Sequence, residues 1–312
     1  MISRQAGRTM GTTVVRLSGQ TGSDKIMNKI KYLPYFCGLM LSMAAIAATP
    51  EMVTFPSKDG KTQLTGYVFK PAQSGPHPAV VMLHGRAGSY SSLKRGQHNA
   101  DALTARHKMW GNFWAERGYL AIHVDSFGPR GYGDGFSKNS YNSRPLEVSE
   151  QLVRPMDAHG ALSYLRTRAD VIPDRIGVQG WSNGGMTVLA ALGPRPPGLD
   201  KPTLASGFRA AIAQYPSCRA QNAEPEYMPY SPLLMMVAED DDEVSPTVCR
   251  TFAEKIRGRS AGLEFVWYDG AHHSYDDPGK TKQSHEPNRR ALQDTLRRAE
   301  AFFAQHLVVL KP

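Results

Sequence analysis

A single turn constrains the fold of this chain more strongly than any other stretch. The sequence from 174 to 192 predicts a short strand, a sharp turn and a helix, and the turn at 180–184 reads G-W-S-N-G. This G-x-S-x-G pattern is typical of a nucleophile elbow, a strained turn that holds a serine hydroxyl above the edge of a sheet. The glycines leave room where the helix packs closely on the strand. We therefore predict that Ser182 is a catalytic nucleophile; the alternative is an ordinary strand-to-helix turn.

The pentapeptide occurs a second time, at 258–262, so the pattern alone does not identify the nucleophile. The second copy follows a helical pattern at 248–257 and precedes a strand pattern at 263–268. That order is the reverse of an elbow. We interpret the second copy as a loop, and the local context selects Ser182.

Strand and helix patterns alternate along the rest of the chain. The region 51–70 predicts a hairpin, and further strands are predicted at 79–83, 119–124, 210–215 and 232–238. Helical patterns cover 110–117, 146–166 and 289–306. This alternation predicts an α/β fold with a mostly parallel sheet and helices on both faces. Because no linker interrupts it, we expect a single domain at 51–309.

The N-terminal segment resembles a targeting signal. A basic stretch at 27–31 precedes an apolar run at 33–46, and Ala45-Ile46-Ala47 fits a small-x-small cleavage site. We predict that residues 1–47 are an N-terminal extension and signal peptide, with the start at Met27 and export to the periplasm or beyond the cell. The alternative is an uncleaved membrane anchor.

The positive charge of the chain is concentrated in that segment. The formal net charge is +9, and the first 31 residues hold six basic residues and one acidic residue, which give +5 and leave +4 for the remainder. A basic protein can bind nucleic acid or anionic membranes. Since the signal accounts for most of the excess, we expect no nucleic-acid partner and no stable membrane association after cleavage.

The remaining members of a catalytic triad should follow later strands. The strand at 233–238 leads into a run of consecutive acidic residues. The distance from the end of the strand favours Asp241 as the triad acid, whereas the distance back from Pro246 favours Asp242. The strand at 263–268 leads to His272 and His273, and we favour His273 as the base. A metal site at the two histidines is the alternative, but no third ligand is apparent, so no metal or cofactor is predicted.

An oxyanion that forms at Ser182 would need two backbone N–H donors. We predict the N–H of Asn183 as the first donor and that of Arg86 as the second, with Ala87 as the alternative to Arg86. His84 and Gly85 would hold the shape of the loop that carries Arg86.

The substrate pocket is expected to involve the long glycine-rich loop at 126–145. We predict that Tyr132 and Phe136 contact substrate, with Tyr141 nearby in the same loop. Trp181, inside the elbow, is a third predicted contact.

Together these motifs resemble those of α/β-hydrolases of the dienelactone hydrolase family. The resemblance covers about 51–309 and rests on H-G-R-A-G at 84–88, D-S-F-G-P-R-G at 125–131, G-W-S-N-G-G at 180–185, Y-P-S-C at 215–218, the acids at 241–242 with Pro246 and Cys249, and G-A-H-H-S-Y at 270–275. It supports Asp241 and His273 as triad members.

The resemblance also bears on the cysteines. An exported chain could bridge Cys218 and Cys249, although their spacing alone does not separate a disulfide from two buried thiols. The resemblance implies that the two lie close together, with a disulfide as a hypothesis.

Enzymes named dienelactone hydrolases use a cysteine nucleophile, whereas this elbow carries Ser182. We therefore expect hydrolysis of small-molecule carboxylic esters through a Ser-His-Asp triad and an acyl-enzyme, without a cofactor. Alternatives are a secreted polyester hydrolase similar to cutinases, a peptidase, and a catalytically silent binding protein on the same scaffold.

Overall fold

The computed structural model describes residues 49–260 and 262–308, and its centre is a single eight-stranded sheet. The strand order is β1-β2-β4-β3-β5-β6-β7-β8. The strands are β1 (Glu51–Pro56), β2 (Gln63–Phe69), β3 (His77–Leu83), β4 (Leu120–Asp125), β5 (Val171–Trp181), β6 (Ala211–Gln214), β7 (Leu233–Asp240) and β8 (Leu263–His272). Only β2 runs antiparallel to its neighbours β1 and β4, and the others pair in parallel. The predicted hairpin and mostly parallel sheet are confirmed.

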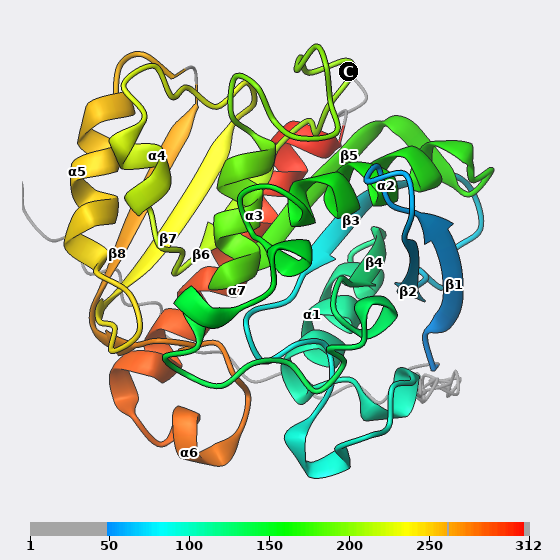
Figure 1. Cartoon of the computed structure of the whole chain (residues 1–312), viewed down its shortest axis with the longest axis horizontal. Helices are drawn as coiled ribbons and strands as arrows, with labels where there is room; N and C mark the ends of the chain where they lie inside the picture. Colours follow the sequence, from blue (N-terminus) through cyan, green and yellow to red (C-terminus); the bar gives the residue numbers. More distant parts are fainter. Residues whose placement is uncertain (1–48, 261, 309–312) are drawn as a thin grey trace, which may run out of the picture. The chain divides into compact units, whose positions relative to one another are not determined.

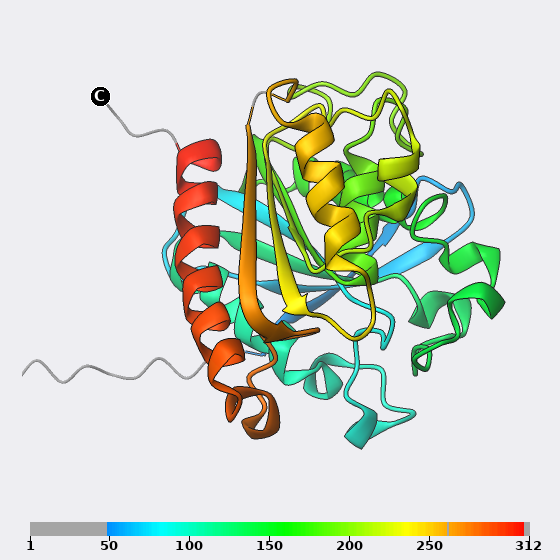
Figure 2. The ribbon, with the colours of Figure 1, turned by 90° about the vertical axis from the view of Figure 1, so that its left-hand side faces the viewer.

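Helices cover both faces of the sheet, as Figures 1 and 2 show. They are α1 (Ala105–Glu116), α2 (Arg154–Thr167), α3 (Asn183–Ala191), α4 (Arg219–Ala223), α5 (Pro246–Ile256), α6 (Lys280–Gln283) and α7 (Glu286–Leu307). One buried cluster joins the sheet to α2, α3 and α5, and the other joins it to α1 and α7. The period-two alternation of a strand explains the division, since Val81 packs in the first cluster and Val80 in the second.

The helix expected at 146–166 begins later than predicted. Leu146–Val148 forms a short 3-10 turn, and α2 starts only at Arg154. Pro155 lies in the first turn of α2, where its missing N–H costs no hydrogen bond. The carbonyl of Ser149 accepts hydrogen bonds from the N–H groups of Val153 and Arg154, which turns the chain into the helix.

The predicted signal peptide, the start at Met27 and the cleavage site lie outside the described residues. Within the described ranges, none of the helices combines the length and the apolar character needed to cross a membrane.

Cys218 and Cys249 form a disulfide, so the hypothesis drawn from the resemblance is confirmed. Cys218 directly precedes α4, and Cys249 lies in α5. Both are fully buried. The bridge therefore ties the segment after β6 to the helix that follows the acidic loop.

Replacing both cysteines with serine is expected to lower the free energy of unfolding by about 3–4 kcal/mol, because the disulfide closes a loop with a sequence separation of 31 in the unfolded chain. Urea unfolding of parent and variant would measure the difference. Reductant should destabilise the parent but leave the variant unchanged. Two free thiols in the mass of the unreduced parent would contradict the assignment.

Four histidines besides His273 are almost completely buried among the described residues: His84, His107, His123 and His159. Burial is the main cause that lowers the pKa of each imidazole, to about 3 for His123 and to about 4 for His159. The folded protein therefore holds all four as neutral rings at neutral pH.

We expect the free energy of unfolding to fall as the pH drops below about 6.5. The unfolded chain takes up protons on these histidines from that pH downward, whereas the folded chain does not until its lowered pKa values are reached. Each such histidine contributes a slope of about 1.4 kcal/mol per pH unit. Urea unfolding between pH 7.5 and 5 would measure the slope. His159→Asn should lower the slope by the contribution of one histidine, because asparagine does not titrate. The variant should still fold, since asparagine can donate to the Pro197 carbonyl that His159 contacts at 2.8 Å. An unchanged slope would contradict this account.

Candidate active site

Ser182 sits at a sharp turn between β5 and α3. Its backbone has φ 53° and ψ −115°, a conformation that side-chain-bearing residues rarely adopt. Glycine is required around it, because a Cβ on Gly180 would lie 2.2 Å from the carbonyl oxygen of Gly184, and a Cβ on Gly184 would lie 2.0 Å from that of Leu83. The turn is fixed from the other side by a hydrogen bond from Ser182 N–H to the Gln214 carbonyl. The structure thus has the strand-turn-helix geometry expected of an elbow.

The ring of His273 lies between the Ser182 hydroxyl and Asp241. The distance from His273 Nε2 to Ser182 Oγ is 2.9 Å, and that from Nδ1 to Asp241 Oδ2 is 2.7 Å. Because the carboxylate can only accept, Nδ1 carries the hydrogen and Nε2 is free to accept from the hydroxyl. The side chain of Asp241 is 1% exposed and that of His273 is 5% exposed. This is the arrangement in which an imidazole can remove the serine proton.

The two neighbouring carboxylates have different surroundings. Asp241 Oδ1 accepts from the N–H groups of Glu243 and Val244, each at 2.9 Å, which leaves Oδ2 for His273. The side chain of Asp242 is 64% exposed and pairs with Lys138 at 2.5 Å. The hydrogen bond from Lys138 is the main cause that lowers the pKa of Asp242. The structure therefore brings Asp241, and not Asp242, to the imidazole.

His272 and His273 point to different partners. His272 stacks on His285 with ring centroids 4.2 Å apart, and its backbone N–H donates to Asn288. The ring of His273 packs on that of Tyr215 in a T-shaped arrangement, and the His273 carbonyl accepts a hydrogen bond from Lys282. Across residues 49–260 and 262–308, no three His, Cys, Asp or Glu side chains are grouped so that they could hold a metal ion.

The segments that carry the two predicted oxyanion donors come close to Ser182. Asn183 is the first residue of α3, where backbone N–H groups have no partner within the helix. The loop after β3 also runs next to the elbow, since a Cβ on Gly85 would lie 3.5 Å from the Cβ of Ser182. Arg86 follows directly. The roles of Asn183 and Arg86 remain predictions, as does the alternative Ala87, whose backbone packs on Gly135.

The side chain of Arg86 links three loops beside the nucleophile. It forms a two-pronged ion pair with Glu243, with both distances at 2.7 Å, and donates to the Phe136 carbonyl. Burial acts to raise the pKa of Glu243, but hydrogen bonding from Arg86 and nearby positive charge outweigh it, and the pKa lies below its usual value. Glu243 Oε2 also lies 3.7 Å from His273 Nε2. Glu243 is thus a charged residue of the site that sequence reasoning did not single out.

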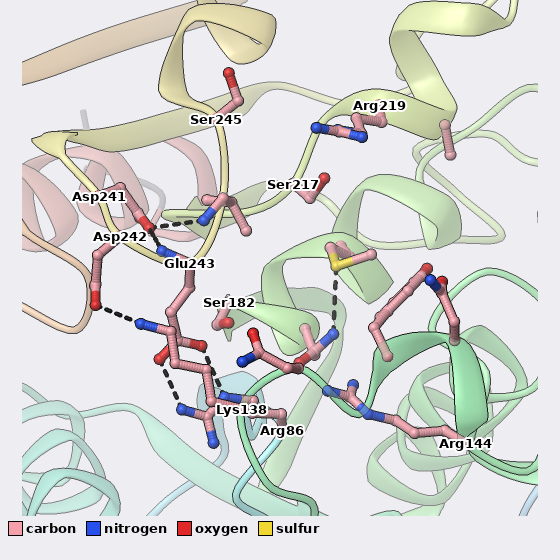
Figure 3. A pocket seen from close by; sticks show the side chains of 17 residues that line it. Arg86, Lys138, Arg144, Ser182, Ser217, Arg219, Asp241, Asp242, Glu243 and Ser245 are labelled. Carbon is pink, nitrogen blue, oxygen red and sulfur yellow. Dashed lines mark hydrogen bonds and ion pairs between the residues drawn. The ribbon is translucent and has the colours of Figure 1, made fainter.

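A cavity of about 840 Å³ opens onto Ser182. Figure 3 shows Ser182 between the acidic loop of Asp241 to Glu243 and the segments that carry Arg144 and Arg219. The cavity is lined by Arg86, Lys138, Asn139, Tyr141, Asn142, Arg144, Ser182, Asn183, Met186, Ser217, Arg219, Ala220, Asp241, Asp242, Glu243, Val244 and Ser245. Tyr141 thus lies at the cavity, whereas Tyr132 and Phe136 are not among the lining residues.

The placement of the aromatic residues bears on the predicted substrate contacts. Phe136 packs on Phe127 and Tyr132, with ring centroids 5.1 and 5.4 Å away, so it takes part in the packing of its own loop. Trp181 is completely buried against Trp110 and His107 under α1. As the last residue of β5 it alternates to the sheet face opposite the cavity. The predicted substrate contact of Trp181 is therefore wrong, whereas those of Tyr132 and Phe136, which do not line the cavity, stay predictions.

A mostly parallel sheet and a seryl elbow at the carboxyl end of a central strand define a protein of the α/β-hydrolase fold. The chain belongs to the dienelactone hydrolase family, whose profile matches residues 64–307.

Individual relatives match parts of the chain. The uncharacterized protein YfhR of Salmonella typhi is 32% identical over 149 residues, which are 47% of this chain and 41% of that protein. Human dipeptidyl peptidase 8 is 29% identical over 172 residues, 54% of this chain and 16% of the peptidase. The chain thus spans less than half the length of these curated relatives.

Among solved structures, esterase 2 of Thermogutta terrifontis phosphorylated by paraoxon superposes with a TM-score of 0.58 at 19% identity. The match covers 85% of this chain and 97% of the esterase. At this identity the similarity establishes the fold.

Proposed function

We propose that this protein is a serine hydrolase that cleaves carboxylic esters through an acyl-enzyme. The observation that carries the proposal is the hydrogen-bonded series from Asp241 through His273 to Ser182, which ends at an open cavity. Membership of the dienelactone hydrolase family supports the reaction class. The serine at the elbow favours ordinary esters over dienelactones, for which the named enzymes use cysteine.

In the proposed mechanism, His273 Nε2 accepts the proton of Ser182 as Oγ attacks the ester carbonyl. Asp241 stabilises the imidazolium that forms. The negative charge that develops on the carbonyl oxygen is held by the N–H groups of Asn183 and Arg86, together with the positive end of α3. His273 then protonates the leaving alcohol. Water, activated by the same imidazole, attacks the acyl-enzyme and releases the acid.

We also propose that the protein works outside the cytoplasm, in the periplasm or beyond the cell. The buried disulfide supports this, because such bonds form and persist in oxidising compartments. The expected signal peptide at 1–47 agrees with it.

The experiment is an assay of the purified protein on p-nitrophenyl esters of increasing acyl length, with a fluorophosphonate probe for Ser182. Turnover together with labelling of Ser182 would support the proposal. Labelling without ester turnover would leave a serine hydrolase of another substrate class, and a dipeptide anilide and a polyester film would then test the peptidase and polyester alternatives. Absence of both would favour a catalytically silent binding protein.

A further inference from the structure

Arg154 is a fully buried arginine without a direct ion pair in the part of the chain that the structure describes, although the charges of Glu150 and Asp157 act to raise its pKa. It is the first residue of α2, and its exposed fraction is 0%. It makes no ion pair within the described ranges, whereas the neighbouring Arg130 and Arg144 pair with Asp157 and Glu150. An unpaired buried cation is costly, because the protein replaces its hydration only in part. A buried cation of this kind suggests a functional role, because its desolvation lowers the stability of the fold.

The guanidinium of Arg154 is directed at one main-chain atom. Its Nη2 donates to the carbonyl oxygen of His84 at 2.6 Å, while Nε and Nη1 have no protein partner. Its Cζ lies 5.1 Å from the centre of the Phe127 ring. Burial is the largest cause that lowers the pKa of Arg154, to about 10, so the group is still a cation at neutral pH.

His84, whose carbonyl accepts from Arg154, also contacts the peptide group of a proposed oxyanion donor. His84 is fully buried, and burial, followed by the charge of Arg154, holds the pKa of its ring well below the usual value. Its Nε2 accepts from the Ser126 N–H at 3.2 Å, so the ring hydrogen is on Nδ1 and donates to the Gly85 carbonyl at 2.8 Å. The Gly85 carbonyl and the Arg86 N–H belong to the same peptide group. A hydrogen bond to that carbonyl therefore orients and polarises the N–H at the other end.

The same carbonyl of His84 also borders the elbow. A Cβ on Gly184 would lie 2.8 Å from it, and the next residue, Gly85, runs beside Ser182. Arg154 thus fixes the point at which the oxyanion loop meets the first turn of α3. Arg154 does not line the cavity, so its positive charge acts on the loop without contacting a bound substrate.

We propose that Arg154 is a positioning residue for the oxyanion hole. Its guanidinium holds the His84 carbonyl and, through His84, the peptide whose N–H at Arg86 receives the oxyanion, and its charge favours the negative transition state. The inference rests on the proposed ester hydrolysis and deepens it. It assigns part of transition-state stabilisation to a residue that touches neither substrate nor nucleophile.

The test compares parent, Arg154→Met and Arg154→Lys, with kcat referred to sites titrated by a fluorophosphonate. Methionine removes the charge at similar volume, and we expect kcat to fall about 10- to 100-fold with KM almost unchanged. Lysine keeps the positive charge but lacks the planar donor group, so the kcat of Arg154→Lys should lie between those of the parent and Arg154→Met. The exposed Arg290→Met serves as a control and should match the parent.

A second readout separates positioning from folding. With an alkyl trifluoromethyl ketone, Ser182 Oγ bonds to the carbonyl carbon, the carbonyl electron pair moves to oxygen, and the serine proton passes to His273. The inhibitor thus creates an oxyanion in the hole, and Arg154→Met should weaken it by the same factor as kcat. The urea midpoint of this variant is measured alongside, because loss of the guanidinium also leaves the His84 carbonyl without this donor.

Arg154→Met with a per-site kcat and ketone affinity within about twofold of the parent would overturn the inference. Activity loss that only follows the folded fraction would overturn it as well. If Arg154→Met does not fold, Arg154→Lys decides: a reduced per-site kcat supports the role of the guanidinium, and parental kcat refutes it. An inactive parent that Ser182-directed probes do not label would instead refute the proposed function.

Discussion

Replacing Ser182 with alanine is expected to lower kcat for short p-nitrophenyl esters by about 10⁴- to 10⁶-fold, because the acyl-enzyme can no longer form. The fold should survive, since the variant keeps the backbone hydrogen bond from residue 182 to the Gln214 carbonyl. Activity and fluorophosphonate labelling would be measured together on the same preparation, and both should disappear.

The chain offers a matched control for this experiment. Ser260 is the central residue of the second G-x-S-x-G copy, which follows α5 and precedes β8. Ser260→Ala should keep parental activity and labelling. Loss of activity in Ser260→Ala, or full activity in Ser182→Ala, would remove the elbow from the mechanism.

The second large effect is expected for Asp241→Asn, with kcat lower by about 10³- to 10⁴-fold. Asparagine keeps the shape and can still accept from the Glu243 and Val244 N–H groups. Its amide, however, would present a donor to His273 Nδ1 and favour the tautomer with the hydrogen on Nε2. That nitrogen could then no longer accept the serine proton.

Asp242→Asn is the paired control, because it changes the neighbouring carboxylate in the same way. Asp242 is exposed and contacts Lys138, so the kcat of Asp242→Asn should stay within about threefold of the parent value. Steady-state kinetics at neutral pH would compare the two variants. A larger loss for Asp242→Asn than for Asp241→Asn would reverse the assignment of the acid.

The sequence allowed the elbow to be predicted because its requirements are local. Only glycine fits at 180 and 184, and the strand before Ser182 and the helix after it have their own periodic patterns. The fold class followed for the same reason, since each strand-helix unit is recognisable within about 30 residues. The late start of α2 could not be predicted from the local pattern, because hydrogen bonds to the Ser149 carbonyl compete with helix formation in the same segment.

The pocket was harder to predict because it depends on contacts between distant segments. No local signal distinguishes Asp241 from Asp242; the two differ only in burial and in which one reaches His273. The place of Trp181 beside the nucleophile in the motif suggests a substrate contact, whereas strand alternation directs its side chain under α1. Glu243 and Arg154 become noticeable only when Arg86 and His84, far away in the sequence, are brought beside them.

The positive φ of Ser182 has a consequence for directed evolution of this protein. A side-chain-bearing residue in that conformation costs on the order of 1–3 kcal/mol, which glycine would not incur. Selection for heat tolerance alone would therefore reward Ser182→Gly, a variant that folds better and has no nucleophile. A library of variants of this protein should be screened for turnover in every round, because at position 182 thermal stability favours glycine whereas catalysis requires serine.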